Sequence, residues 1–126
     1  MRPRFAKKDK THKSIIRDLL AVLGGGSVVS WVDDGRAVED VNAYTGYLRG
    51  VKLYITDHSQ QGGACPDLHI SIGRLGEVWV EIKDKGKADE KYLTAGERAF
   101  FAECDAPKII VDEVEAILFY LDAVIP

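Results

Sequence analysis

The sequence contains only two cysteines and no long apolar run, and both shortages exclude classes of protein. Cys65 and Cys104 are too few for a disulfide scaffold and lack the CxxC spacing of a zinc or redox site, so we expect reduced thiols. The apolar stretches are far shorter than the roughly 18 residues of a membrane span, and the N-terminus lacks the apolar core of a signal peptide. We therefore expect a cytoplasmic protein without membrane contact.

The length and composition indicate one folded domain. With 126 residues the chain can bury one hydrophobic core but not two, so we expect residues 1–126 to form a single domain. Apolar residues make up 46% of the chain and charged residues 29%, close to the averages of globular proteins. Wholesale disorder and fibrous architecture are thereby excluded.

Basic charge is concentrated at the N-terminus although the formal net charge is -3. We define a basic arm at about residues 1–11. Over residues 1–17 the only acid is Asp9, whereas the basic residues are Arg2, Arg4, Lys7, Lys8, Lys10, Lys13 and Arg17. Such an arm attracts phosphates and releases their counterions, which makes nucleic acid a candidate partner. We assign phosphate contacts to Arg2, Arg4, Lys7 and Lys8. The alternative is a solvated, frayed terminus.

Apolar periodicity and turn residues predict an alternation of helices and short strands. Residues 12–23 have helical spacing and end at the glycines of 24–26, and a second helix over 94–104 ends before Pro107. We predict strands over 27–32, 51–56 and 108–111, a turn at 33–35, a polar loop at 57–63 and a last helix over 113–121. Residues 36–49 are ambiguous.

The clearest local prediction is a β-hairpin. Two alternating apolar runs, 67–72 and 77–83, are joined by residues 73–76, which begin and end with glycine. Together with the other elements, the hairpin indicates a mixed sheet covered by helices, which is an α/β fold.

Charged side chains are expected on one face of this hairpin. Glu81 and Lys83 are two residues apart in a strand and so project from the same face. The apolar residues around them project from the other face: Val78, Val80 and Ile82. If Arg74 lies at the centre of the turn, Asp67 is directly opposite Glu81. The next even register places Asp67 opposite Lys83, still on that face.

Two carboxylates on neighbouring strands suit a hard divalent cation, which prefers oxygen ligands and keeps waters that phosphate oxygens can replace. Bound at Asp67 and Glu81, Mg²⁺ would polarise a phosphodiester and activate water, while Lys83 would orient that water or neutralise developing charge. The alternative is an exposed strand face on which acid and base form a weak cross-strand pair.

Pro66-Asp67, followed after a hairpin by Glu81-Ile82-Lys83, resembles the PD-(D/E)xK nuclease signature. With the residues of 63–68 and 93–97, the pattern is similar to the VRR-NUC (virus-type replication-repair nuclease) branch. The resemblance implies a restriction-endonuclease-like mixed sheet flanked by helices. It also implies that Asp67, Glu81 and the carbonyl of Ile82 bind Mg²⁺, for which Mn²⁺ substitutes, and that Lys83 assists the nucleophile.

The same resemblance implies an endonuclease that hydrolyses DNA, on branched or four-way junction substrates, and that pairs into a homodimer. Lys85, Lys87 and Lys91 follow the signature at a position suited to backbone phosphates, although a lysine-rich loop is often only solvated. Two further functions stay open: a catalytically inactive nuclease-fold module that binds nucleic acid, and a sequence-specific, restriction-like enzyme.

Two residues depart from the family pattern. His12 stands where family members often carry an acid near the start of the first helix; it can support the site as a metal or phosphate contact, or be a helix-start histidine half-covered by the arm. Glu97 stands where glutamine is usual, on the apolar face of its helix. A buried carboxylate needs a partner, which is either Lys83 or, in a capping box, the backbone of Thr94.

Overall fold

The computed structural model describes residues 4–31, 37–59 and 65–126, with side chains described for residues 11–26, 43–59 and 65–126. In chain order, its elements are α1 (Arg4–Leu23), β1 (Gly26–Trp31), β2 (Ala37–Leu48), β3 (Val51–Asp57), β4 (Leu68–Ser71), the 3₁₀ turn η1 (Gly73–Leu75), β5 (Glu77–Ile82), the 3₁₀ turn η2 (Glu90–Tyr92), α2 (Ala95–Glu103), β6 (Lys108–Val111) and α3 (Val114–Val124).

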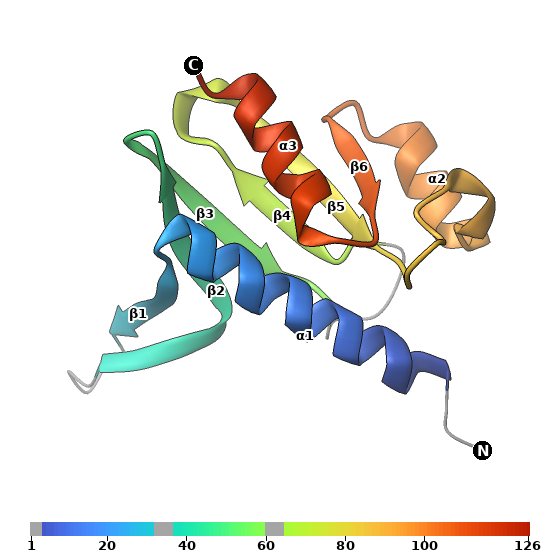
Figure 1. Cartoon of the computed structure of the whole chain (residues 1–126), viewed down its shortest axis with the longest axis horizontal. Coiled ribbons are helices and arrows are strands. Elements are labelled where there is room, and N and C mark those ends of the chain that lie inside the picture. The colour runs from blue at the N-terminus through green and yellow to red at the C-terminus, as the bar shows by residue number, and fades with distance from the viewer. Residues whose placement is uncertain (1–3, 32–36, 60–64) are drawn as a thin grey trace.

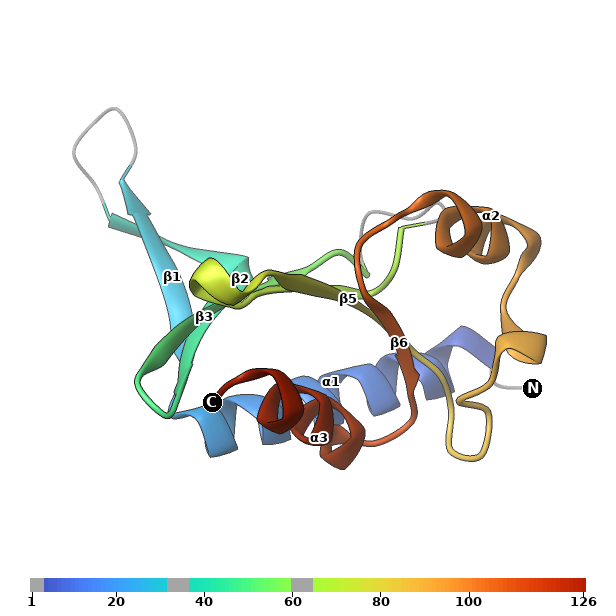
Figure 2. The same ribbon diagram turned by 90° about the horizontal axis from the view of Figure 1, so that it is seen from above.

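The strands form one mixed sheet whose order is the order of the chain, β1-β2-β3-β4-β5-β6. Neighbouring strands are antiparallel as far as β5, and β6 then pairs parallel to β5 after the crossover through α2. In Figures 1 and 2, α1 and α3 lie side by side under one face of the sheet, and α2 lies beyond the β6 edge, towards the other face. The predicted α/β fold, a mixed sheet flanked by helices, is confirmed.

The hydrophobic core lies between the sheet and the pair α1 and α3. Every second residue of β4 and β5 points into it, including Leu68, Ile70, Val78, Val80 and Ile82, all with 0% exposure. The apolar stripe of α1 meets them with these residues: Ile15, Ile16, Leu19 and Leu23. Each large side chain buried in this way contributes about 1.5–3 kcal/mol relative to an exposed one. The core therefore fixes which face of each strand remains for polar residues.

The first helix is longer than predicted, because α1 begins at Arg4 and not at residue 12. Residues 4–11, predicted as an arm, lack apolar periodicity but are rich in lysine and arginine, which favour helix. The phosphate contacts predicted for the arm cannot be placed, since Arg2 and the side chains of Arg4, Lys7 and Lys8 lie outside the described residues. None of the helices in the described ranges is long and apolar enough to cross a membrane.

Other boundaries differ by smaller amounts. The ambiguous stretch 36–49 forms β2, which is held by pairing with both β1 and β3. The last helix continues to Val124, because Ile125 beyond it is also buried in the core. The turn predicted at 33–35 and part of the loop predicted at 57–63 lie outside the described residues.

The chain leaves α1 through a turn that lies directly against β2. A Cβ atom added at Gly25 would be 2.3 Å from the carbonyl oxygen of Thr45, and one at Gly46 would be 2.8 Å from Cβ of Leu23. Real Cβ atoms do not approach backbone so closely, so glycine at these two positions sets the distance between helix and sheet. Gly26, the next residue, has no atom within 4 Å of its Cβ position.

We therefore predict that Gly25→Ala destabilises the protein by about 2 kcal/mol or more, since the backbone of β2 must shift. The matched variant Gly26→Ala should change the free energy of unfolding by less than about 0.5 kcal/mol. Urea unfolding followed by circular dichroism measures both. Equal effects of the two substitutions would contradict the close approach of α1 to β2.

Candidate functional site

The pairing of β4 with β5 sets the geometry of the site. Leu68 is opposite Val80 and Ser71 is opposite Glu77, with the η1 turn centred on Arg74 between the strands. One step beyond Leu68 and Val80, the same register places Asp67 opposite Glu81. Of the two registers that the sequence left open, the structure has the one with Arg74 at the centre of the turn.

The Asp67 carboxylate continues the hydrogen bonding of the sheet where the backbone of Pro66 does not. The Ile72 N–H donates to the carbonyl of Gly76, so these two residues form a hydrogen-bonded pair. In an antiparallel ladder every second pair is of this kind, and counting away from the turn, the pair of Pro66 and Ile82 is the last one. In place of a backbone carbonyl, Asp67 Oδ2 accepts from the Ile82 N–H at 2.8 Å. Because proline has no N–H, Pro66 donates nothing to the Ile82 carbonyl.

Glu81 and Lys83 occupy the face of β5 that α2 covers, opposite the hydrophobic core. Glu81 is only 1% exposed. Lys83 Nζ is 2.8 Å from Glu97 Oε1 on α2, and both side chains are 12% exposed. Glu97 also pairs with the side chain of Glu81 through a hydrogen bond in which one of the two carboxyl groups carries a proton. The predicted catalytic residues Glu81 and Lys83 are therefore joined through Glu97.

Glu97 satisfies both of the roles that its sequence position allows. Its Oε1 accepts from Lys83 Nζ and from the Thr94 N–H at 2.8 Å each, while the Thr94 hydroxyl accepts from the Glu97 N–H in a capping box. Burial raises the pKa of Glu97, but the hydrogen bonds from Lys83, Thr94 and Glu81 outweigh it and lower the pKa to about 2. The carboxylate is ionised at neutral pH and holds the Lys83 ammonium.

His12 lies in the body of α1 and faces the same end of the hairpin. It is 4% exposed, with Nε2 at 3.1 Å from Asp57 Oδ1 and Nδ1 at 4.0 Å from Asp67 Oδ1. The alternative of a half-covered histidine at the helix start is wrong, because α1 begins eight residues earlier and His12 is buried against the ends of β3 and β4.

Two residues near the site carried no assignment from the sequence. Asp57 ends β3 and accepts from His12 and from the N–H and hydroxyl of Ser59 at 2.9 and 2.7 Å. Burial raises the pKa of Asp57, but these hydrogen bonds lower it below its ordinary value. Burial, followed by the negative charges of Glu81 and Asp67, raises the pKa of Cys65. The Cys65 thiol is therefore within electrostatic range of both carboxylates.

Trp79, two residues before Glu81 on the same face, walls this end of the sheet. Its ring centroid is 4.5 Å from that of His69, 5.5 Å from that of His58 and 5.3 Å from that of Phe100 on α2.

The lysines that follow β5 have partners of their own. Lys85 Nζ is 2.9 Å from Glu113 Oε2 at the start of α3, and Lys87 and Lys91 lie over the Tyr92 ring at 5.7 and 5.3 Å. These interactions hold the loop to α3 and to η2. The phosphate contacts predicted for the three lysines remain predictions.

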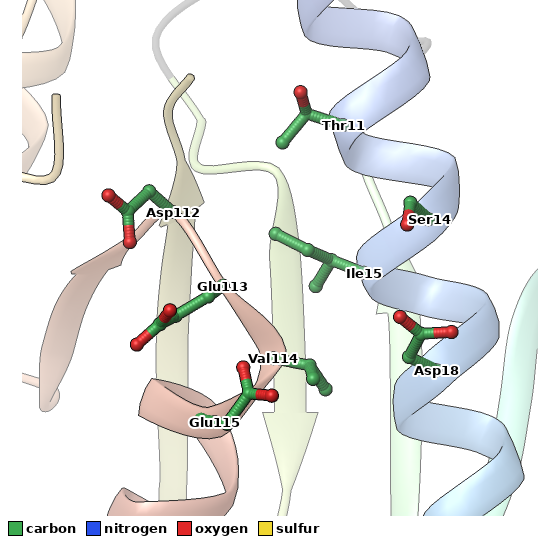
Figure 3. A pocket seen from close by; sticks show the side chains of 8 residues that line it. All are labelled: Thr11, Ser14, Ile15, Asp18, Asp112, Glu113, Val114 and Glu115. Atoms are coloured by element: carbon green, nitrogen blue, oxygen red, sulfur yellow. The ribbon is translucent and has the colours of Figure 1, made fainter. Parts of the chain in front are cut away.

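A separate hollow of about 440 Å³ lies between α1 and the start of α3 (Figure 3). Its lining is acidic and includes no lysine or arginine; it consists of Thr11, Ser14, Ile15, Asp18, Asp112, Glu113, Val114 and Glu115. Such a surface repels phosphates, so it is not a candidate for the nucleic-acid interface.

The donors at the hairpin suit a metal that needs few protein ligands. In the part of the chain that the structure describes, no three His, Cys, Asp or Glu side chains are gathered so as to hold a metal ion. Mg²⁺ commonly uses one or two carboxylates and keeps several waters, so the carboxylates of Asp67 and Glu81 with the carbonyl of Ile82 fit it in donor chemistry.

The low pKa of Glu97 predicts a pH-dependent contribution to stability. Because the folded pKa is about 2 and the ordinary value is 4.5, this contribution is present above about pH 5 and is lost as the pH falls towards 2. Glu97→Gln should destabilise the protein by about 1–2 kcal/mol at pH 7, and by progressively less as the pH falls. Urea unfolding at several pH values measures the difference.

Glu103→Gln, at the exposed end of the same helix, is the matched control and should change stability by less than about 0.5 kcal/mol throughout. A difference between wild type and Glu97→Gln that does not shrink between pH 5 and 2 would show that the ion pair with Lys83 is not its source.

Comparison with known proteins adds no support to the assignment of a metal site at Asp67 and Glu81. No family model matches the sequence, and no curated protein or solved structure is significantly similar to it.

Proposed function

We propose that the protein is a metal-dependent endonuclease of the PD-(D/E)xK type that hydrolyses DNA phosphodiester bonds. The observation that carries the proposal is the β4–β5 register, which sets Asp67 opposite Glu81 with Lys83 two residues further along β5. The buried hydrogen bond between Asp67 and Ile82 supports it, since it fixes one carboxylate at the end of the hairpin. A cross-strand pair on an exposed face, the alternative, would not be buried as Asp67 and Glu81 are.

The two carboxylates and the Ile82 carbonyl have the role of metal ligands in this proposal. Asp67, Glu81 and the Ile82 carbonyl would hold Mg²⁺, or Mn²⁺ in its place, which would supply Lewis-acid polarisation of the phosphodiester and a coordinated water of lowered pKa. Pro66 leaves the Ile82 carbonyl without a ladder donor, which suits a carbonyl that has to serve as a ligand. The Asp67 oxygen that accepts from Ile82 is kept in place, and its other oxygen, Oδ1, lies towards His12.

Lys83 acts through its charge. Its ion pair with Glu97 places a cation on the same sheet face as Glu81, where negative charge develops on the attacked phosphate. Because Glu97 is in turn fixed by the capping box of α2, the ammonium is positioned by a rigid element. Glu97 is thus a positioning residue for Lys83.

The finer parts of the proposal come from the family resemblance: branched or four-way DNA as substrate and a homodimer that brings two sites to two strands. A sedimentation measurement of the oligomeric state and a comparison of linear, flapped and four-way DNA test them. A catalytically inactive binding module of the same fold would bind DNA without cleaving it and without needing a metal.

We predict that Lys83→Ala lowers cleavage by about 100-fold or more but keeps metal binding, whereas Asp67→Ala loses both. The reason is that only the carboxylate is a ligand, and removal of a nearby positive charge does not weaken a cation site. Calorimetric titration of Mn²⁺ and cleavage of four-way DNA separate the two roles.

Matched controls are Lys52→Ala, an exposed lysine of β3, and Asp105→Ala, an exposed acid after α2, both of which should behave as wild type. Full cleavage by Lys83→Ala, or undiminished Mn²⁺ affinity in Asp67→Ala, would refute the assigned roles.

For the N-terminal bases we predict that neutralising Arg2, Arg4, Lys7 and Lys8 together weakens DNA binding and flattens its salt dependence. Removing one phosphate-binding charge should reduce the slope of log K against log salt by about 0.9. Cleavage at saturating DNA should change little, since these residues hold the backbone and not the reacting phosphate. If the slope of log K against log salt in fluorescence anisotropy titrations is unchanged, these residues do not bind phosphates and form a solvated terminus.

A further inference from the structure

His12 has one ring nitrogen hydrogen-bonded and one that lacks a hydrogen-bond partner among the described residues. Nε2 contacts Asp57 Oδ1 at 3.1 Å, whereas the buried Nδ1 has no such partner and lies 4.0 Å from Asp67 Oδ1. Leaving a buried polar atom unsatisfied destabilises the folded state. The residue is 4% exposed, so bulk water does not offset this cost. A ligand between His12 and Asp67 would satisfy the nitrogen.

The surroundings of Asp57 fix which nitrogen carries the proton. Asp57 Oδ1 already accepts from the N–H and the hydroxyl of Ser59, so in this cluster it acts as a hydrogen-bond acceptor. An ionised carboxylate only accepts hydrogen bonds, so the His12 nitrogen facing it is the donor. In the neutral ring the lone pair is then on Nδ1, next to Asp67 Oδ1. Two acceptors that face one another repel unless a proton or a metal cation lies between them, and 4.0 Å is too long for a hydrogen bond.

We propose that His12 Nδ1 is a ligand of the metal ion that Asp67 holds, and that Asp57 orients the ring for this role. The proposal rests on the proposed function, since it concerns the same ion. Histidines that bind metals usually donate their other ring N–H to a carboxylate or a carbonyl, as His12 does to Asp57. Two donors at about 2.1 Å from one ion lie at most about 4.2 Å apart, and the observed separation of 4.0 Å falls within that limit.

A nitrogen ligand changes the kind of metal that the site selects. Mg²⁺ prefers oxygen donors in a near-octahedral shell, whereas imidazole suits divalent transition metals. With His12 in the set, the site favours a divalent transition-metal ion over Mg²⁺, and Mn²⁺ serves as the spectroscopic probe of such an ion. The family resemblance places an acid here, which would give oxygen donors alone; His12→Glu should therefore move the preference towards Mg²⁺.

The test is pulsed electron paramagnetic resonance of Mn²⁺ bound to the full-length protein, which detects a directly coordinated ¹⁴N nucleus. The chain has three histidines, so His58→Gln and His69→Gln are matched controls for His12→Gln. We expect a ¹⁴N coupling in wild type and in both controls, and its loss in His12→Gln. Calorimetric titration should show Mn²⁺ affinity reduced at least tenfold in His12→Gln and by about 10–100-fold in Asp57→Asn.

Circular dichroism checks whether His12→Gln folds. The test does not depend on that variant, because the wild-type spectrum already reports nitrogen coordination and Asp57→Asn tests the orienting carboxylate separately. Mn²⁺ binding without ¹⁴N coupling would overturn the role of His12 while leaving the site at Asp67 and Glu81 intact. A coupling that disappears only in His58→Gln or His69→Gln would overturn it equally. If wild type binds no Mn²⁺, both this inference and the proposed function fail.

Discussion

The hydrogen bond from the Ile82 N–H to the Asp67 carboxylate joins the sheet to the candidate site. The core requires Leu68 and Val80 to face α1 and α3, and a slip of one residue in either strand would turn that strand's apolar residues away from the core. The register is therefore fixed by apolar burial on the face of the sheet opposite the carboxylates. This register places Asp67 at the open end of the hairpin. There the Ile82 N–H is not paired with Pro66 and donates to the Asp67 carboxylate.

Much of the fold followed from local patterns. The hairpin, α2, β6 and α3 were predicted to within a few residues, because each has the apolar periodicity of its type and a turn residue at its end. Two regions lacked such a pattern. The strand β2 depends on partners on both sides, and the first turns of α1 consist of charged helix formers that periodicity does not reveal.

The candidate site was predictable where its residues are near one another in the chain. Asp67, Glu81 and Lys83 come from one hairpin, and spacing was sufficient to place them on one end of it. For Glu97 the sequence left two partners open, and the structure has both, because one oxygen accepts from Lys83 and from Thr94. The contact of His12 with Asp57 depends on how α1 crosses the end of β3, which no local pattern encodes.

The order of the strands also bears on how the site assembles during folding. The contacts of Asp67 with Ile82 and of Lys83 with Glu97 close loops of 15 and 14 residues, whereas His12 and Asp57 are 45 residues apart. Closing the longer loop costs about 1 kcal/mol more in chain entropy. The carboxylates and the lysine form a local unit that nearby pairing is enough to create, and the histidine joins it only when α1 docks. An excursion that releases α1 alone would remove one donor and leave the rest assembled.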